Sequence, residues 1–231
     1  MADERQRGIA VLLANSALMS AGFFLLIPLL SVHLTQDVGF SGAAAGAVLA
    51  IRQLTQQGLM LFGGALADRV GYKRVIAAGM LVRAVGFLGF GLGDSLPVIL
   101  ASAVVAALGG ALFEATGKAA LASLAPPAAR ARLFSLSALA GGVGTTCGPL
   151  LGVWLLRFSF RWVGVAAGGF FLVAAVLSAA LLPALSGPAG AAPPLRRTLS
   201  RVARDRRFVV FTALLTGYWL LHNQIYISVP L

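Results

Sequence analysis

The chain has 231 residues, of which 59% are hydrophobic and only 11% are charged. Soluble domains have roughly 45–50% apolar residues, so this composition predicts a membrane protein. The formal net charge of +11 does not indicate nucleic-acid binding, because long apolar runs separate the basic residues instead of letting them share one solvated face. Cys147 is the only cysteine, which excludes an intramolecular disulfide within these residues.

Seven apolar segments are long enough to cross a bilayer, which needs about 20 predominantly apolar residues. Helices are expected for such segments, because lipid offers no hydrogen-bond partners to the backbone. The predicted fold class is therefore all-α, a polytopic helical membrane bundle. The predicted spans are 9–33, 42–67, 75–93, 97–122, 133–156, 162–182 and 208–231.

Basic residues concentrate in alternate connections between these spans. Cytoplasmic loops of membrane proteins have an excess of Lys and Arg, so we expect a cytoplasmic N-terminus. Asp37, Asp94, Arg157 and Arg161 then fall on the outer side. The thirteen basic residues on the inner side, of eighteen in all, are Arg5, Arg7, Arg69, Lys73, Arg74, Arg130, Arg132, Arg196, Arg197, Arg201, Arg204, Arg206 and Arg207.

Polar side chains interrupt the first two spans. Asn15 in the first span is a candidate for lining a cavity, although such residues more often donate hydrogen bonds between packed helices. In the second span, RQLTQQ places Arg52 and Gln56 four residues apart, with Gln53 and Gln57 in the adjoining row. A polar stripe that faces lipid is costly, so we expect these four side chains to line a cavity or to bond to neighbouring helices.

The connection between the second and third spans reads GALADRVGYKR. Its charges are typical of a cytoplasmic turn, and Gly71 permits a tight reversal. The order GxLADRxGxK resembles the signature turn of the major facilitator superfamily of transporters, with Tyr72 where the family usually has a basic residue. The resemblance implies that Asp68 interacts with a helix N-terminus of an opposite half and helps to hold one conformation. The residues of this conformational-switch motif are Gly64, Leu66, Asp68, Arg69, Gly71, Lys73 and Arg74.

Glu114 in the fourth span is the only acidic residue within the first six predicted spans. Lys118, four residues later, could pair with it along the helix. Arg83 of the third span has a similar predicted depth, since both residues lie about 12 Å from the cytoplasmic ends of their helices. A carboxyl group in low-dielectric surroundings gains or loses its proton according to nearby charges. Glu114, Arg83 and Lys118 are therefore candidates for proton coupling, and a static salt bridge is the alternative.

The fifth span contains GGVGTTCGPLLG, which places Gly144, Gly148 and Gly152 four apart on one helix face, with Pro149 beside the second. Small residues at this spacing let two helices approach closely, and proline removes one backbone hydrogen bond. The pattern GxxxGPxxG resembles the antiporter motif of drug-efflux members of the same superfamily, with Val153 in place of the usual last glycine. Ordinary helix packing is the simpler explanation.

The segment after the sixth span changes from Pro, Gly and Ala to mostly basic residues. We therefore divide the chain into an N-terminal six-helix half (1–183), a cytoplasmic basic linker (184–207) and the first span of a second half (208–231). In that last span Tyr218 and Asn223 are candidates for lining a cavity. His222 is a further proton-coupling candidate, because histidine titrates near physiological pH.

The chain as a whole resembles the bacterial multidrug-efflux group of this superfamily. The resemblance implies twelve spans in two halves, and export of amphipathic drugs in exchange for protons across the bacterial cytoplasmic membrane. It also implies no cofactor, since the proton gradient supplies the energy; the expected partners are lipids, the small-molecule substrate and protons, and not nucleic acid. One departure is that ASAVVAALGG in the fourth span lacks the arginine that many proton-coupled relatives have before such glycines.

The mechanism of this superfamily rocks one half against the other, so the chain is expected to be a fragment that needs the missing C-terminal half for transport. The sequence has neither an HExxH nor a GxSxG motif and no metal-ligand cluster, so an enzyme and a metal site are not expected. Two alternatives to drug export stay open. One is an uptake symporter of the same superfamily for a small metabolite, and the other is a membrane scaffold or half-transporter that assembles with a second chain.

Overall fold

The computed structural model describes residues 2–185, 204–207, 209–215 and 217. The chain divides into two compact units, Met1–Ala189 and Gly190–Leu231. The described part of the first unit is built from helices and contains no strand. Its elements are α1 (Ala2–Val32), η1 (His33–Asp37), α2 (Gly42–Val70), α3 (Tyr72–Leu92), α4 (Leu96–Leu124), η2 (Pro127–Ala129), α5 (Arg130–Leu156) and α6 (Phe160–Leu181).

The predicted all-helical membrane bundle is confirmed for this unit. By length and composition, five of the described helices could cross a membrane: α1 continued by η1, α3, α4, α5 preceded by η2, and α6. α2 is as long as α4 but is not in this group, and its polar residues include Arg52 and three glutamines. The predicted seventh span, 208–231, lies mostly outside the described residues. Within this span, residues 209–215 are described and helical.

Five of the first six predicted spans agree with the helix bounds to within three residues. The exception is the start of α1, which begins at Ala2 and not at residue 9. The polar residues before Ile9 extend the helix, because acidic side chains such as Asp3 and Glu4 stabilise its positive N-terminal end. A membrane span is thus only the apolar part of a longer helix.

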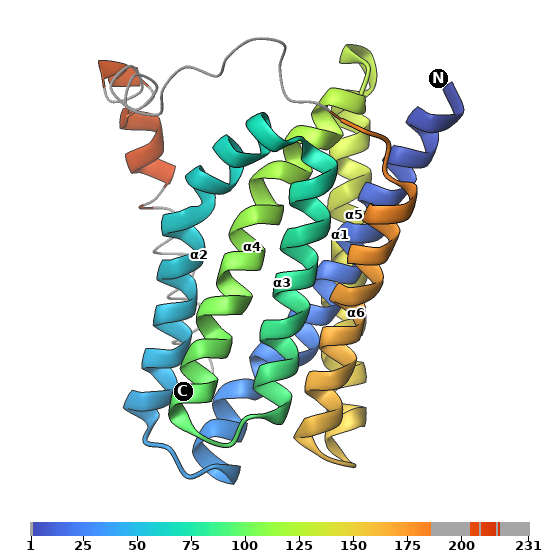
Figure 1. Ribbon diagram of the computed structural model, residues 1–231. Coiled ribbons are helices and arrows are strands. Elements are labelled where there is room, and N and C mark those ends of the chain that lie inside the picture. The colour runs from blue at the N-terminus through green and yellow to red at the C-terminus, as the bar shows by residue number, and fades with distance from the viewer. Residues whose placement is uncertain (1, 186–203, 208, 216, 218–231) are drawn as a thin grey trace. The chain divides into compact units, whose positions relative to one another are not determined.

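The helices pack in a definite order (Figure 1). α2 packs on α4, α4 on α3, α3 on α6, α6 on α1, and α1 on α5. The first three helices and the last three make matching contacts, since α1 contacts α5 as α4 contacts α2, and α1 contacts α6 as α4 contacts α3. This correspondence is the packing expected of two three-helix repeats.

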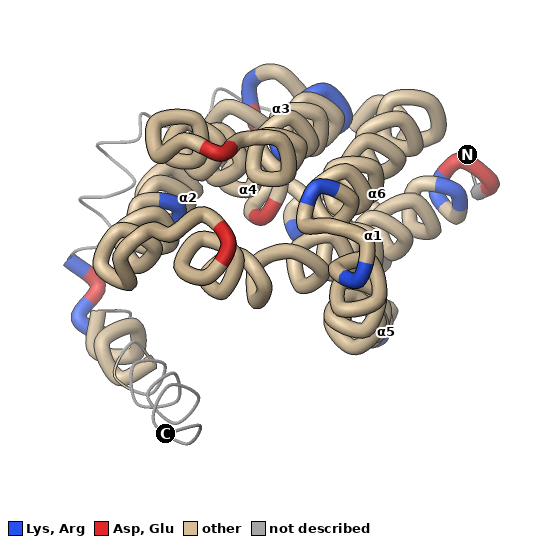
Figure 2. Tube along the Cα trace, turned by 90° about the horizontal axis from the view of Figure 1, so that it is seen from below, with Lys and Arg blue, Asp and Glu red and all other residues tan. Residues whose placement is uncertain are grey.

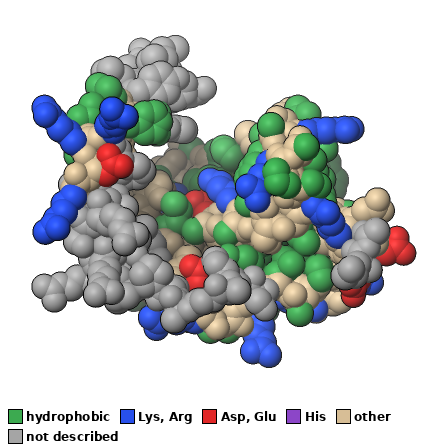
Figure 3. All heavy atoms as spheres, turned by 90° about the horizontal axis from the view of Figure 1, so that it is seen from above, with side chains coloured by type: hydrophobic (Ala, Val, Ile, Leu, Met, Phe, Trp, Pro, Cys, Tyr) green, Lys and Arg blue, Asp and Glu red, His purple; other side chains and the backbone are tan. Residues whose placement is uncertain are grey.

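Because successive helices alternate in direction, the α2–α3 and α4–α5 connections lie at the same end of the unit as the N-terminus (Figure 1). The space-filling view from that side shows Lys and Arg side chains standing out among hydrophobic and uncharged residues (Figure 3). The tube view from the opposite end shows that Lys, Arg, Asp and Glu take up only a small part of the trace (Figure 2). The charged residues that do lie along the helices therefore need a structural reason.

Candidate functional site

A polar cavity of about 280 Å³ lies among α1, α2, α3 and α4. The polar stripe of α2 faces this cavity. α2 is less apolar than the other long helices, and these polar side chains point into the bundle. Apolar residues of α1 form the other wall, which gives the cavity a mixed surface. Its lining residues are Met19, Ser20, Phe23, Phe24, Arg52, Gln53, Gln56, Gln57, Arg83 and Glu114.

Gln56 connects the basic and the acidic side chains of this cavity. The Nη1 atom of Arg52 donates to Oε1 of Gln56 at 3.2 Å, and Nε2 of Gln56 donates to Oε1 of Glu114 at 2.8 Å. Nη2 of Arg52 also donates to Gln53 at 3.0 Å. The packing of α2 on α4 thus brings the RQLTQQ stripe onto the one acidic residue of the predicted first six spans.

Arg83 of α3 is almost completely buried, with 1% of its surface exposed. Its guanidinium carbon lies 5.6 Å from the ring centroids of both Phe23 and Phe87 and 5.1 Å from that of Phe171. The negative faces of aromatic rings attract a cation, so the three rings partly replace the water that the guanidinium has lost. The absence of a side chain at Gly110 makes room for this group, because a Cβ atom there would collide with Nη1 of Arg83.

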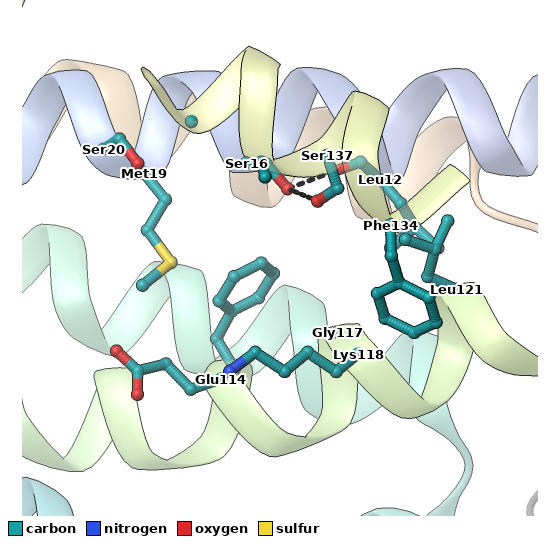
Figure 4. A pocket seen from close by; sticks show the side chains of 13 residues that line it. Leu12, Ser16, Met19, Ser20, Glu114, Gly117, Lys118, Leu121, Phe134 and Ser137 are labelled. Carbon is teal, nitrogen blue, oxygen red and sulfur yellow. Dashed lines mark hydrogen bonds between the residues drawn. The ribbon is translucent and has the colours of Figure 1, made fainter. Parts of the chain in front are cut away.

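A second cavity, of about 470 Å³, lies between α1, α4 and α5 (Figure 4). Met19, Ser20 and Glu114 line both cavities, so the carboxylate of Glu114 lies where the two adjoin. Figure 4 shows Met19 reaching from α1 towards Glu114 on α4. Ser16 and Ser137 share a hydrogen bond of 2.8 Å across the α1–α5 contact at its edge.

The expected partners of Glu114 differ from those that the structure gives it. Lys118 lines the second cavity and is exposed, and among the described residues it makes no ion pair with Glu114 within 4.0 Å. Arg83 lines the first cavity with Glu114, but its guanidinium packs on aromatic rings. The hydrogen bond to Glu114 comes from Gln56, a residue of another helix that helical spacing alone did not connect to it.

Most residues of the conformational-switch motif are helical, so the turn between α2 and α3 is shorter than the predicted connection. Asp68 lies in the last turn of α2 and Lys73 in the first turn of α3, so the reversal takes place at Gly71 alone. Gly71 has φ of 98° and ψ of 143°, a conformation that side chains disfavour. The hydroxyl of Tyr72 donates to Asp68 at 3.1 Å, and the backbone N–H of Tyr72 donates to the carbonyl of Leu185 at 2.9 Å.

The glycines of the proposed antiporter motif form the contact of α5 with α1. Gly144, Gly148 and Gly152 are buried, and a Cβ atom on any of them would collide with the backbone of α1. The close approach of two helices is therefore confirmed, and the partner is the first helix. α5 continues as an α-helix through Pro149.

Asn15, a candidate for lining a cavity, lines neither of the two cavities described above. It is completely buried, and its Nδ2 atom donates to Oγ of Ser178 at 2.7 Å, which joins α1 to α6. A buried amide is stabilised by such a bond, so Asn15 has the helix-packing role that is usual for this residue type. The candidates Tyr218, His222 and Asn223 lie outside the described residues.

Sequence reasoning missed the aromatic residues around the arginines and the role of Gly110. Phe23, Phe87 and Phe171 lie in three different apolar helices, where an aromatic residue gives no distinguishing signal. Gly110 entered the sequence analysis only as one of the two glycines at the end of ASAVVAALGG. The occurrence of Arg83 within an apolar segment was the one sequence signal that could have prompted a search for such partners.

Comparison with known sequences gives the family. The sequence model of the Major Facilitator Superfamily matches residues 12–231, and the chain therefore belongs to that superfamily.

Among curated proteins, the chain is similar to the multidrug resistance protein MdtH of Edwardsiella ictaluri (strain 93-146). The two are 39% identical over 227 residues, which is 98% of this chain and 56% of the relative. Multidrug resistance protein MdtH of Klebsiella pneumoniae (strain 342) is 38% identical over 231 residues, which is 100% of this chain and 57% of that relative. The chain thus spans somewhat over half the length of these relatives.

Two solved structures share the fold. The human organic anion transporter MFSD10 (TETRAN) has a TM-score of 0.68 at 19% sequence identity, over 87% of this chain and 56% of that chain. A peptide transporter, POT, has a TM-score of 0.72 at 17% identity, over 96% of this chain and 46% of that chain. At these identities the similarity concerns the fold alone, and it agrees with a multi-pass membrane protein.

Proposed function

We propose that the chain forms the N-terminal half of a proton-coupled exporter of amphipathic small molecules. The proposed location is the bacterial cytoplasmic membrane, with the N-terminus in the cytoplasm. The name of the MdtH relatives and the resemblance of GxxxGPxxG to the antiporter motif support export over uptake. Transport by the chain is proposed to need the C-terminal half that its relatives have.

The observation that most supports this proposal is the position of Glu114. Its carboxylate lies at the junction of two cavities, it is half-buried, and it accepts a hydrogen bond from Gln56. A carboxylate in such a place binds or releases a proton as the charges and the solvent around it change. We propose that Glu114 takes up the proton whose movement drives export.

In this scheme, hydrogen bonds through Gln56 link the charge of Glu114 to Arg52. The amide of Gln56 accepts from Arg52 and donates to Glu114, so protonation of Glu114 weakens the bond at one end of this series. The attraction between α2 and α4 at this point then falls. Proton binding would in this way favour one arrangement of the cavity over another.

The direction of transport is tested in bacterial cells that accumulate fluorescent amphipathic dyes. Cells that express the longest product of the gene should retain less dye than cells with an empty vector, and a protonophore should remove the difference. Cells that express Glu114→Gln should retain as much dye as the vector control. Asp94→Asn removes an exposed carboxylate at a helix connection, and cells that express it should export dye normally.

Higher dye content in the expressing cells would indicate uptake and would reject export in favour of a symporter. Dye content equal to the vector control for every compound, with the protein present in the membrane, would favour the scaffold or half-transporter alternative. Co-purification of a second six-helix chain would then identify the partner.

A further inference from the structure

The polar cavity has more positive than negative groups. Arg52 and Arg83 line it together with a single acidic residue, Glu114. Both arginines are largely buried, with 6% and 1% of their surfaces exposed. An unbalanced cation is costly away from water, so a cavity built in this way favours an occupant with negative charge.

Several donors of the two arginines have no hydrogen-bond partner among the described residues. They are Nε of Arg52 and both Nε and Nη1 of Arg83. Most buried polar groups in proteins are bonded, so unpartnered guanidinium nitrogens of residues that line a cavity indicate a missing acceptor. A guanidinium is planar and always charged, and its N–H groups match the two oxygens of a carboxylate.

The aromatic contacts do not supply that acceptor. The ring of Phe23 lies 5.1 Å from the guanidinium carbon of Arg52 and 5.6 Å from that of Arg83, so one ring serves both cations. The face of an aromatic ring attracts a cation, but it is a poor acceptor for N–H groups that point outward in the plane of the guanidinium. Nε of Arg52, and Nε and Nη1 of Arg83, are thus left without an acceptor in the described part of the chain, although aromatic rings lie beside both guanidinium groups.

The rest of the cavity wall describes the remainder of the ligand. Phe23, Phe24 and Met19 form its apolar side, on α1. A ligand with an oxyanion at the arginines would therefore have an aromatic or apolar body along α1. The cavity volume of about 280 Å³ suits a small amphipathic molecule or one end of a larger one.

We propose that Arg52 and Arg83 form an oxyanion-binding subsite that takes the carboxylate, or a similar singly charged oxyanion, of an amphipathic substrate. The biological role of this subsite rests on the proposed transport function, but its binding chemistry does not. The subsite distinguishes charged ligands from neutral ligands of the same shape.

The test compares 2-naphthoate with 2-naphthamide, which has the same ring system without the charge. Binding is measured by calorimetry on the longest product of the gene, purified in detergent, with no pH gradient. Naphthoate should bind about tenfold or more tightly than naphthamide, because one charge-assisted hydrogen bond to a buried group corresponds to at least that factor.

Arg52→Gln should weaken naphthoate binding about tenfold and leave naphthamide binding nearly unchanged. Arg83→Met should have the same effect, and Arg52→Gln decides alone if Arg83→Met does not fold. The matched control is Arg130→Gln, which removes an exposed arginine at the start of α5 and should alter neither affinity. Equal binding of the acid and the amide, or naphthoate binding that both arginine variants retain, would overturn the proposal.

Chloride tests the other source of negative charge. If chloride alone gives a binding isotherm that Arg52→Gln abolishes, and it displaces naphthoate completely, the subsite is one for inorganic anions and the substrate proposal is wrong. Little competition by chloride supports the organic oxyanion. Selective naphthoate binding without dye export would reject the transport proposal only, and export without selective binding would reject the subsite only.

Discussion

Gln56 is the residue on which the polar cavity depends most. Its amide group has both a donor and an acceptor, and the structure uses the acceptor for Arg52 and the donor for Glu114. Glutamate in this position would place two carboxylates together, and leucine would remove the bond to Glu114 and leave Arg52 with Gln53 alone among the described residues. A neutral amide is thus the side chain that joins a cation to an anion while leaving Glu114 free to change its charge.

Gly71 gives the first prediction at this scale. Its φ of 98° is a conformation that residues with a Cβ atom adopt only under strain, and the Cβ atom of an alanine would also lie 3.3 Å from the carbonyl oxygen of Leu185. Gly71→Ala should lower the free energy of unfolding by about 1–3 kcal/mol. Loss of intrinsic tryptophan fluorescence during thermal or SDS unfolding measures the change.

Gly46→Ala is the matched control for this variant. Gly46 is a helical residue of α2, and no atom lies within 4 Å of the position of its Cβ. Alanine has a higher helix propensity than glycine, so Gly46→Ala should be neutral or slightly stabilising. Equal stability of the Gly71 and Gly46 variants would show that the reversal between α2 and α3 does not need glycine.

The sequence predicted some contacts at the residue scale and missed others for a physical reason. Helical spacing connects residues of one helix, and it correctly grouped Arg52 with Gln56. The hydrogen bond from Gln56 to Glu114 spans 58 positions, and the rings around Arg83 come from three helices. Such contacts depend on helix packing, which a single sequence does not specify. The proton-coupling roles of Glu114, Arg83 and Lys118 stay predictions.

The contact between α1 and α5 shows how small residues determine which helices meet. A Cβ atom on Gly144 would collide with the backbone carbonyl of Ala17, and backbone atoms cannot move aside as a flexible side chain can. Gly144→Ala should therefore lower the free energy of unfolding by about 1–3 kcal/mol, the usual cost of overpacking. The same unfolding measurement applies.

Gly142→Ala serves as the control on the same helix. Its added methyl group meets no atom within 4 Å, so stability should stay the same or rise slightly. If Gly144→Ala were as stable as Gly142→Ala, α1 and α5 would not be as close as described, and the packing of the candidate antiporter motif would need revision.

At the scale of elements, hydropathy predicted the helices well but not the helix faces or neighbours. Apolar run length determines where a helix can lie in lipid, which explains the agreement of most helix bounds to within three residues. It does not determine that α2 packs on α4 or that α5 packs on α1. The glycine pattern indicated that α5 has a close neighbour, but no sequence signal identified α1 as that neighbour.

At the scale of the whole molecule, the arrangement of charges predicts the orientation in the membrane. The N-terminus and the α2–α3 and α4–α5 connections lie at one end of the first unit (Figure 1). The predicted inner arginines of this unit belong to these segments: Arg5, Arg7, Arg69, Arg74, Arg130 and Arg132. In a Cys147→Ser background, Asp94→Cys should react with a membrane-impermeant maleimide in intact cells. Arg130→Cys should react only after the membrane is permeabilised.

Both substituted positions are exposed, so a difference in labelling reports the side of the membrane and not burial. Cys147 is also exposed, which is why it must be removed first. Labelling of Arg130→Cys, but not of Asp94→Cys, in intact cells would reverse the proposed orientation.

The central claim is that substrate export is coupled to protons through Glu114. The most direct measurement uses inside-out membrane vesicles that have built an acidic interior by respiration, with an acridine dye to report the pH gradient. Addition of an exported substrate should release protons from the vesicles and restore part of the dye fluorescence. Glu114→Gln should abolish this response, and Asp94→Asn should keep it. Substrate transport without any proton movement, or an undiminished proton response in Glu114→Gln, would contradict the account.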